Sequence, residues 1–536
     1  MEEKKIYLEK QGEKLVPTEA GMEYLSEAVT DPTGPVYALT GKLSPAASVA
    51  CMARLSRSSS DMRMILLKEF AGNEESIDKF VEKVTAEYGD DSVLQLGTIS
   101  LVVEGASNLL TKILEWGRLM AYLEQSTRYI FFDEPGPDGK FRYFVPGHLP
   151  EPLKEKYVAG MEGIFTLYSE VARGITAYLR NKNPEPAEKA ERQAWLNSTR
   201  AQACDAARGM LPVATRSTVG IVGSTQAVQS LILHLFASEL PEAQETGKQI
   251  LKEARKVASA FFKRTDMPDR GIAWSLYARD TEKTMRSFAK DSALVSLPAN
   301  DSELEREVSL CDYYPKDEMD LIPEFLYAVS GTSLEVLRRV VAGWSEAKKE
   351  EVWSKYIGNR LNRRHKPGRA LEAAFYEFEI LADYGTFRDL QRHRMVSAWE
   401  WQRLTPRYGY SVPELVRDSG YEEKFHESLC TSKELCESLI EPGFEEESQY
   451  ATSLAHRMRY RFVMNAREAF HMIELRTQPA GHPGYRKICQ NMHRLIEGVH
   501  PKMAGAMKFI NQEGDPELTR LEAERATQAK LALLGE

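Results

Sequence analysis

The sequence predicts an α/β (α+β) protein built as two tandem domains, and three observations lead to this prediction. At 536 residues the chain is longer than one ordinary hydrophobic core supports, so two or more domains are expected. Short β-branched runs alternate with segments of helical apolar spacing. A pattern of Arg, Ser and Glu occurs twice, around Arg118 and again around Arg394, and a repeat at that distance indicates duplicated domains rather than a solenoid.

Composition excludes several classes of protein. No apolar run approaches the roughly 20 residues that a membrane span needs, and the charged start of the chain lacks an apolar signal core, so we expect a cytoplasmic protein. The six cysteines form no Cys-x-x-Cys pair, which argues for reduced thiols and against a structural zinc site. We expect no metal. A formal charge of −9 argues against a protein that binds nucleic acid over its whole surface, so local basic clusters indicate small anionic ligands.

The densest basic cluster lies at residues 387–408. Guanidinium groups suit phosphate recognition because they offer planar, bidentate donors that stay charged. The alternative interpretation of this cluster is a basic helix end on the surface or a patch that binds nucleic acid. The cluster contains Arg388, Arg392, His393, Arg394, Arg403 and Arg407, with Ser397 and Glu400 between them.

The second copy of the pattern lies earlier in the chain, at residues 118–129. Glu124, Ser126 and Arg128 stand in an intact E-x-S-x-R-Y, although Ser126 could also be a simple helix cap. The β-branched run at 98–103 before it predicts a buried strand.

The remaining elements follow from apolar periodicity and from turn residues. We expect an N-terminal extension at 1–35, a first repeat at 36–263, a linker at 264–300 and a second repeat at 301–536. Helices are expected at about 44–55, 76–88, 108–116, 151–179, 224–236, 241–262, 345–357 and 515–536, in a Glu-rich insertion at 421–449, and as one amphipathic helix from Phe462 to Arg476.

Together these motifs resemble the signature of flavin-dependent thymidylate synthases, R-H-R-x-x-S-x-N-E-x-S-x-R-Y. Arg392-His393-Arg394 begins the second copy, and Ala207-Arg208-Gly209-Met210-Leu211-Pro212 in the first repeat is similar to the family's A-R-x-x-L-P. The resemblance implies two tandem domains of the thymidylate-synthase-complementing type, each a small mixed sheet with a helical layer.

The resemblance also implies an activity, namely methylation of dUMP to dTMP with FAD, methylenetetrahydrofolate and NADPH. Arg476 would meet the pyrimidine ring as the catalytic residue. The residues that would hold FAD are Arg392, His393, Arg394, Asn465, Arg467 and His482. The residues that would hold the nucleotide are Glu124, Ser126, Arg128, Arg208, Ser397, Glu400 and Arg407.

Each repeat departs from the family pattern in a different place. The first has Trp116-Gly117 in place of Arg-His, and Phe236 at the expected position of the pyrimidine arginine. The second has Trp399 for Asn, three extra residues before Thr405-Pro406-Arg407-Tyr408, and Ser448-Gln449-Tyr450 near the place of A-R-x-x-L-P. Because the family builds each site across subunits of a homotetramer, we expect a composite site, half from each repeat, and a homodimer that mimics that tetramer.

Asp389 is a further departure, because it replaces the Gln that precedes R-H-R in the family. A carboxylate beside a nucleotide phosphate would repel it unless Arg388 or Arg392 were its partner.

Three alternatives to the thymidylate synthase prediction stay open. The chain could be a divergent flavin enzyme acting on another pyrimidine nucleotide. It could be a non-catalytic nucleotide-binding or scaffold paralogue, in which the losses are neutral decay of a duplicated gene. It could modify nucleic acid through the basic loop at 360–369. The sequence contains no Walker A loop, no G-x-S-x-G motif and no Rossmann fingerprint, so these motifs do not indicate another class of enzyme.

Overall fold

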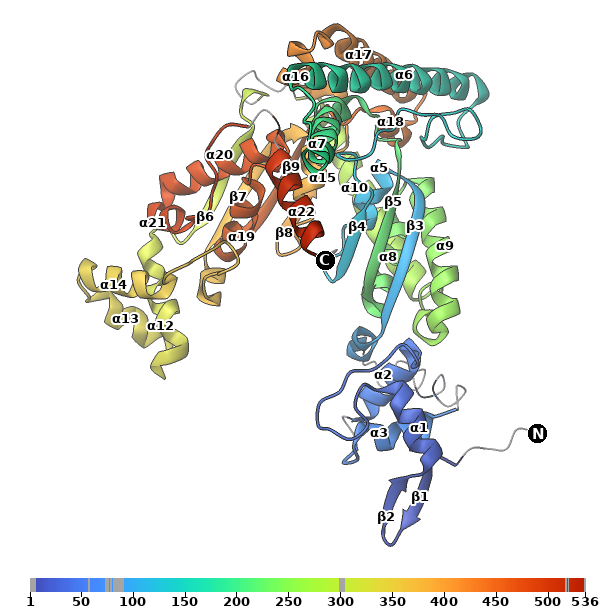
Figure 1. Cartoon of the computed structure of the whole chain (residues 1–536), viewed down its shortest axis with the longest axis vertical. Helices are drawn as coiled ribbons and strands as arrows, with labels where there is room; N and C mark the ends of the chain where they lie inside the picture. Colours follow the sequence, from blue (N-terminus) through green and yellow to red (C-terminus); the bar gives the residue numbers. More distant parts are fainter. Residues whose placement is uncertain are drawn as a thin grey trace. The chain divides into compact units, whose positions relative to one another are not determined.

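The computed structural model describes residues 6–55, 58–72, 77, 80, 91–297, 304–515, 518 and 520–534 (Figure 1). The helix predicted at 76–88 lies outside these residues, apart from 77 and 80. The chain forms two compact units. Unit 1 comprises Met1–Ala106, Ile113–Glu124 and Thr218–Leu297; unit 2 comprises Ser107–Lys112, Gln125–Ser217 and Pro298–Glu536.

Unit 1 contains a three-stranded sheet in the order β3-β5-β4, together with an N-terminal hairpin. β4 runs antiparallel to β5, with Met120 opposite Gly223. In the hairpin, Gly12 supplies the left-handed backbone (φ +64°) that its tight turn requires. The strands are β1 (Leu8–Gln11), β2 (Lys14–Pro17), β3 (Thr98–Ser107), β4 (Met120–Glu124) and β5 (Arg216–Ser224).

The helices of unit 1 follow the apolar spacing of the sequence. Ser224 begins α8 as its N-cap, because its hydroxyl accepts the backbone N–H of Ala227 at 3.2 Å. The elements are α1 (Glu19–Ala28), α2 (Pro45–Leu55), α3 (Met62–Ile65), η1 (Leu66–Phe70), η2 (Asp91–Leu96), α8 (Thr225–Ala237), α9 (Pro241–Ala258), η4 (Ser259–Phe262), α10 (Gly271–Asp291) and η5 (Leu294–Ser296).

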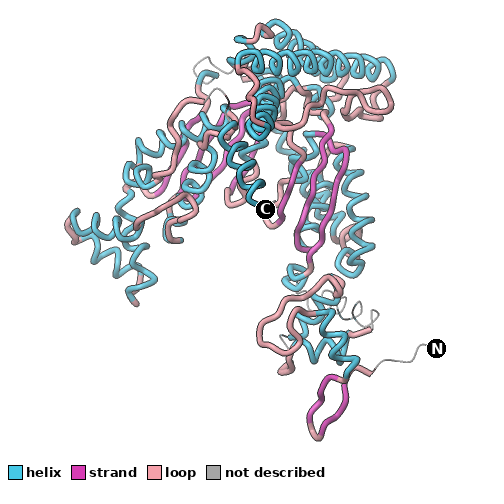
Figure 2. Tube along the Cα trace, viewed as in Figure 1, coloured by secondary structure: helices cyan, strands magenta, loops and turns pink. Residues whose placement is uncertain are grey.

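Unit 2 is organised around a sheet, whose strands are magenta in Figure 2. The sheet has four strands in the order β6-β7-β9-β8, and every pairing is antiparallel. The central strands β7 and β9 alternate in burial, so one face carries Tyr376, Phe378 and Ile380 into the core. Helices α19 and α20 pack on this sheet. The strands are β6 (Val308–Tyr314), β7 (Phe375–Asp383), β8 (Ser397–Trp401) and β9 (Arg457–Asn465).

A segment of the first repeat belongs to unit 2. Its long helix α6 (Glu151–Lys182) lies along α17 (Glu422–Ile440) (Figure 1), and Gly174 leaves room for Tyr421, whose ring would overlap a Cβ there. α7 (Lys189–Ala207) leads into the short turn η3 (Arg208–Met210). α5 (Asn108–Leu114) begins in unit 2 and ends in unit 1.

Two corresponding loops of the repeats pair with one another inside unit 2. Val213 N–H donates to the Thr452 carbonyl at 2.8 Å, and Ala455 N–H donates to the Gly209 carbonyl at 2.8 Å. Pro212 and Ser453 form the bridge between these bonds. The loop that carries Arg208 is therefore fixed to the second repeat by its backbone.

The other helices of unit 2 come from the second repeat. Asn465 begins α19 by accepting the backbone N–H of Glu468 at 2.8 Å, as Ser224 does in α8. The elements are η6 (Glu318–Leu321), α12 (Ile322–Ser330), α13 (Leu334–Ala342), α14 (Glu346–Ile357), η7 (Arg369–Ala373), α15 (Tyr384–Leu390), η8 (Pro406–Tyr408), α16 (Glu414–Asp418), α18 (Glu445–Ala451), α19 (Ala466–Arg476), α20 (Pro483–Val499), α21 (Pro501–Ala506) and α22 (Leu521–Leu534).

The predicted fold class is confirmed, since both units combine helices with a small sheet. The sheet of unit 2 is antiparallel throughout, however, and not mixed as predicted. One prediction is wrong: Phe462 to Arg476 is not a single helix. Phe462–Asn465 end strand β9, where alternate side chains are buried, and helix α19 starts only after the Asn465 cap. Within the segment predicted as a linker, the structure has helix α10. The compact units also differ from the repeats, whose predicted boundaries stay predictions.

Among the described residues, no helix is both long enough and apolar enough to cross a membrane.

A buried ion pair ties the predicted basic loop at 360–369 to the core of unit 2. Arg360 donates to both carboxylate oxygens of Glu474, at 2.7 and 2.5 Å, and to the Ala506 carbonyl at 2.9 Å. The two side chains are 3% and 1% exposed. Arg360 is therefore committed to α19 and not available to a nucleic acid.

We predict that Glu474→Ala lowers the free energy of unfolding by about 3–5 kcal/mol, because it leaves the Arg360 charge buried and unpaired. Urea denaturation of the two proteins measures the difference. Glu351→Ala, which removes the exposed Lys355–Glu351 pair of α14, is the control and should change stability little. Equal stability losses in the two variants would contradict the assigned role of Glu474.

Candidate functional site

Arg208 and Asp389 form a buried ion pair between the two repeats. Arg208 begins η3, directly after α7, and Asp389 lies near the end of α15. Both Nη atoms of Arg208 donate to the same oxygen, Oδ2 of Asp389, at 3.2 Å, and the side chains are 5% and 10% exposed. The partner that the structure gives Asp389 is thus Arg208, where we had expected Arg388 or Arg392.

Arg128, the second predicted phosphate ligand from the first repeat, is held in a similar way. Its Nε and Nη2 donate to the two oxygens of Asp205, each at 2.8 Å, a bidentate geometry. Arg520 also donates to both oxygens of Asp205, at 3.2 and 2.9 Å, and is 2% exposed. Ser126 accepts the backbone N–H of Arg128 at 3.2 Å, so it shapes this turn.

Tyr485 on α20 links Arg128 to the predicted catalytic residue, Arg476. The Tyr485 hydroxyl accepts from Arg128 Nη1 at 2.9 Å, and the Arg476 guanidinium lies 5.2 Å from the centre of the Tyr485 ring. Such contacts between a cation and a ring face are attractive and hold the guanidinium in place. A tyrosine therefore stands between an arginine of each repeat.

A second set of contacts orients Arg476 from its other side. Arg476 Nε donates to His393 Nε2 at 2.9 Å, so Nε2 carries the lone pair and His393 Nδ1 carries the proton. That proton is donated to Glu468 Oε1 at 2.8 Å. Burial lowers the pKa of His393 to about 4, which keeps the imidazole neutral at physiological pH.

The same contacts bear on metal binding. Ligand atoms of His393, Glu468 and His471 lie within 4.8 Å of one another, close enough to hold an ion. However, Arg476 donates to Nε2 of His393, so Nδ1 must keep its proton and cannot ligate a metal. Among the described residues this group supports a hydrogen-bonded triad rather than a metal centre.

Charge around Asp389 is strongly positive. Burial alone would raise the pKa of this carboxyl, but the guanidinium groups of Arg208, Arg128, Arg476 and Arg392 hold it well below its usual range. Two of these arginines come from each repeat. Asp205 behaves alike: burial opposes ionisation, yet Arg128 lowers its pKa to about 2. Arginines of both repeats therefore act on the same carboxylate within unit 2.

His482, predicted to lie beside FAD, sits between the two ion pairs. Its Nδ1 accepts the backbone N–H of Gly484 at 3.1 Å and caps α20, so its Nε2 carries the proton and faces the Asp205 carbonyl at 3.2 Å. Burial, together with the charge of Arg208, lowers the pKa of His482 to about 3.

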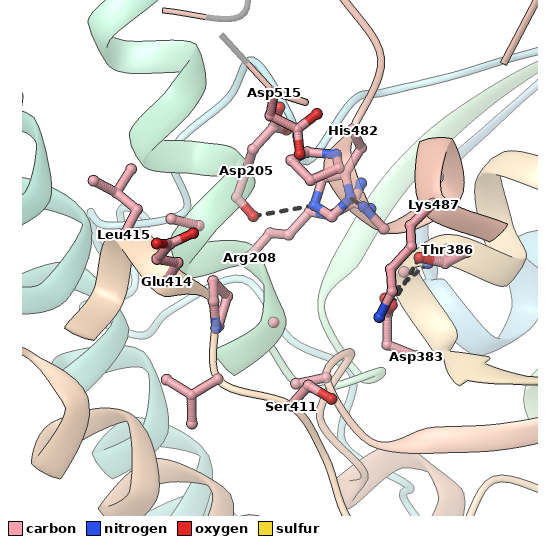
Figure 3. Close-up of a pocket in the computed structure, with 18 of the residues that line it drawn as sticks. Asp205, Arg208, Asp383, Thr386, Ser411, Glu414, Leu415, His482, Lys487 and Asp515 are labelled. Atoms are coloured by element: carbon pink, nitrogen blue, oxygen red, sulfur yellow. Dashed lines mark hydrogen bonds between the residues drawn. The ribbon is translucent and has the colours of Figure 1, made fainter. Parts of the chain in front are cut away.

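A cavity of about 580 Å³ opens beside Arg208 within unit 2. Figure 3 shows Arg208, His482 and Asp205 at one side and Asp383 and Lys487 at another. Lys487 pairs with Glu307 at 2.9 Å, and Asp383 accepts from Thr386 Oγ1 at 2.7 Å. Apolar side chains, among them Leu381, Val412 and Phe425, complete the lining, so the cavity suits a ligand with both a polar and an apolar part.

The structure also gives the positions of the other predicted site residues. Asn465 caps α19, and Arg467 donates to the Pro367 carbonyl at 3.0 Å. Ser397 donates to the Val463 carbonyl at 3.2 Å, and Arg407 lies over the Tyr408 ring. Arg392, Arg394 and Glu400 are exposed. Glu124 is buried in unit 1.

The matching positions of the two repeats can now be identified from their caps and bridges. The residue of α8 that corresponds to Arg476 of α19 is Leu235, one before the expected Phe236. Gln449 corresponds to Arg208, because Thr215 and His456 form equivalent bridges. Gln449 accepts from the Leu404 backbone N–H at 3.2 Å.

Asp205, Tyr485 and Arg520 were not predicted. Asp205 and Tyr485 belong to α7 and α20, and Arg520 lies in the segment 515–536, which was predicted only as a helix. The nearest signal was that Asp205 lies three residues before Arg208, on the same helical side.

We predict that His482→Gln reduces the pH dependence of stability between about pH 6.5 and 4. The folded state takes up this proton only near pH 3, whereas an unfolded histidine takes it up near pH 6.5. The unfolded chain therefore binds more protons in that window, and stability, complete above about pH 6.5, is lost as the pH falls. Urea titrations at several pH values measure it; the exposed His365→Gln is the control. An unchanged slope in His482→Gln would contradict the assignment.

Comparison with known proteins agrees with the duplicated arrangement. Two separate segments, residues 38–259 and 317–502, match the family model described as thymidylate synthase complementing protein. Together they cover most of the chain.

Relatives of two kinds are similar to this chain. A UPF0159 protein of Chlamydia muridarum (strain MoPn / Nigg) is 31% identical over 527 residues, 95% of this chain and 98% of the relative. A UPF0159 protein of Thermoplasma acidophilum is 30% identical over 503 residues, 89% of this chain and 97% of the relative. A flavin-dependent thymidylate synthase of Clostridium tetani is 23% identical over 194 residues, 36% of this chain and 71% of the relative. The chain belongs to the thymidylate synthase complementing protein family.

Proposed function

We propose that this protein is a flavin-dependent, thymidylate synthase-like enzyme that methylates dUMP at a composite site, half from each repeat. The observation that carries the proposal is the set of four arginines around Asp389: Arg128 and Arg208 from the first repeat, Arg392 and Arg476 from the second. Guanidinium groups gathered in this way suit a phosphorylated ligand with a polar ring.

The charge balance supports an anionic ligand. Arg520 adds a fifth guanidinium, and Asp205 and Asp389 pair directly with arginines of this set. His482 adds no charge near neutral pH. The gathered guanidinium groups would favour a nucleotide phosphate as the ligand.

The chemistry of the predicted flavin ligands fits a flavin dinucleotide. Arg392 and Arg394 are exposed on either side of the buried His393, and the Arg467 side chain, which also pairs with Glu372, is 33% exposed. A pyrophosphate would be recognised by these three cations. Asn465 and His482 would complete the set. When bound, the flavin supplies the hydride for the reaction.

The chain's own residues would bind and orient the substrate. Arg476, held between His393 and Tyr485, is aimed by contacts on two sides. An arginine fixed in this way favours build-up of negative charge on a ring carbonyl without having to reorganise. Burial raises the pKa of the Cys489 thiol to about 12, so this nearby cysteine is a poor nucleophile. The fixed position of Arg476 and the high pKa of the Cys489 thiol both support chemistry without a protein nucleophile.

Three further points stay predictions from the sequence. They are the co-substrates methylenetetrahydrofolate and NADPH, the homodimer and the cytoplasmic location. The two alternatives within the same fold are a flavin enzyme acting on another pyrimidine nucleotide and a non-catalytic nucleotide-binding paralogue. The relatives that match most of the chain have names that state no activity. The presence of Asp389 in the site is the observation that favours an altered ligand preference.

We predict that Arg128→Ala weakens dUMP binding about ten- to a hundredfold, because one charge-assisted phosphate contact is worth roughly 1.5–3 kcal/mol. The bound flavin should remain. Asp205 keeps Arg520 as a partner, so the fold should tolerate the change. Arg394→Ala should instead lower the flavin content while dUMP still binds.

Calorimetry with dUMP and the flavin absorbance of the purified proteins measure both effects. Arg173→Ala, which removes an arginine whose side chain is 59% exposed, is the control and should change neither. If Arg128→Ala bound dUMP as tightly as the wild type, the first repeat would not contribute to the site. A colourless protein that FAD does not stabilise would favour the non-catalytic alternative.

A further inference from the structure

The two carboxylates that occupy the arginine site are held very differently. Asp205 uses both oxygens and is shared by Arg128 and Arg520, with three of its four hydrogen bonds to them at 2.8 to 2.9 Å. Asp389 uses one oxygen, which takes both Nη atoms of Arg208 at the longer distance of 3.2 Å. Asp389 therefore has fewer and longer hydrogen bonds to arginine than Asp205 has.

Arg208 itself has little freedom to move. A Cβ on Gly385 would lie 3.3 Å from its Nη2, so the guanidinium packs directly against the glycine backbone of α15. The next residue, Gly209, is bonded through its carbonyl to Ala455 of the second repeat. If the pair opens, Asp389 must be the partner that leaves.

Asp389 also occupies the point where positive charge converges. Besides Arg208, the guanidinium groups of Arg128, Arg476 and Arg392 act on it. Arg208 and Asp205 line the cavity of about 580 Å³ (Figure 3), so a ligand has access to the guanidinium group to which Asp389 is bound. A carboxylate is a small oxyanion, and it lies where a phosphate oxygen would make the same contacts.

We propose that Asp389 is a resident counter-ion of Arg208, which an incoming phosphate group must displace in order to bind. This inference rests on the proposed function in that the phosphate is taken to belong to a nucleotide. Asp389 thereby sets the affinity of the site, since its negative charge opposes a dianion within a few ångströms. The Asp389 carboxylate therefore favours binding of a phosphate group that carries less negative charge, and it lowers the affinity of the site for free phosphate.

The test uses the full-length protein and inorganic phosphate as the probe. Asp389→Asn removes the charge and keeps the shape, and should raise phosphate affinity by about tenfold or more in calorimetry. Asp312→Asn is the control. It removes an exposed carboxylate of unit 2 that pairs with Lys316 away from the cavity, and should leave the affinity unchanged. Equal affinity in wild type and Asp389→Asn would overturn the proposal.

The melting temperatures of the variants show whether they still fold. Asp389→Asn leaves Arg208 without its counter-charge, so the variant should melt earlier and recover more than the wild type when phosphate is added. Asp389→Gln, with a longer amide, should behave in the same way. Phosphate that raises the melting temperature of all three proteins equally would again overturn the proposal.

A comparison of dUMP with deoxyuridine separates this inference from the proposed function. If Asp389→Asn binds phosphate more tightly but dUMP no better than phosphate, the counter-ion inference stands and the uracil nucleotide proposal fails. If dUMP binds better than phosphate and deoxyuridine, yet with the same affinity in wild type and Asp389→Asn, the proposed substrate stands and the inference fails.

Discussion

Buried pairing of arginines with carboxylates across the two repeats is the interaction on which the site of unit 2 depends. Arg208 comes from the first repeat and Asp389 from the second, and the pair is almost fully buried. Burying either charge alone would be strongly unfavourable, so each repeat needs the other in order to keep its charged residue inside. The backbone bonds between Gly209 and Ala455 and between Val213 and Thr452 hold the two segments at this distance.

This dependence explains how complementary losses in a duplicated chain can be tolerated. The first repeat keeps Arg128 and Arg208 but has Leu235 at the position of Arg476; the second keeps Arg476 but has Gln449 at the position of Arg208. Because one segment of the first repeat folds within the unit of the second, the retained arginines meet in one place. Neither repeat contains the complete set, so selection on the joint site would not preserve the missing residues.

Much of this arrangement could be predicted from the sequence. The helices α2, α6, α8 and α14 and the strand β3 follow apolar periodicity, which depends only on neighbours along the chain. Arg128, Arg208, Arg392 and Arg476 were found through their motifs, and the structure gathers them around Asp389. The strand end at Phe462–Asn465 was missed because strand β9 leads into helix α19 at Asn465, with no glycine or proline turn to separate the two.

The ion-pair partners could not be predicted, because they depend on contacts between residues far apart in the chain. The Asp205–Arg520 contact joins residues of α7 and the C-terminal segment, and no local pattern indicates it. The Asp389 substitution was recognised, yet its partner was expected among sequence neighbours, while the structure pairs it with Arg208 on a loop of the other repeat. Local motifs identify the cations of such a site; the fold decides which carboxylates reach them.

A double-mutant cycle between Arg208 and Asp389 tests most directly whether the two repeats form one site. Arg208→Met, Asp389→Asn and the double variant would be unfolded in urea and compared with the wild type. Direct contact predicts a coupling free energy of about 1–3 kcal/mol, so that the double variant is less destabilised than the sum of the single ones. Additive effects, within about 0.5 kcal/mol, would mean that the two residues do not meet and would contradict a composite site.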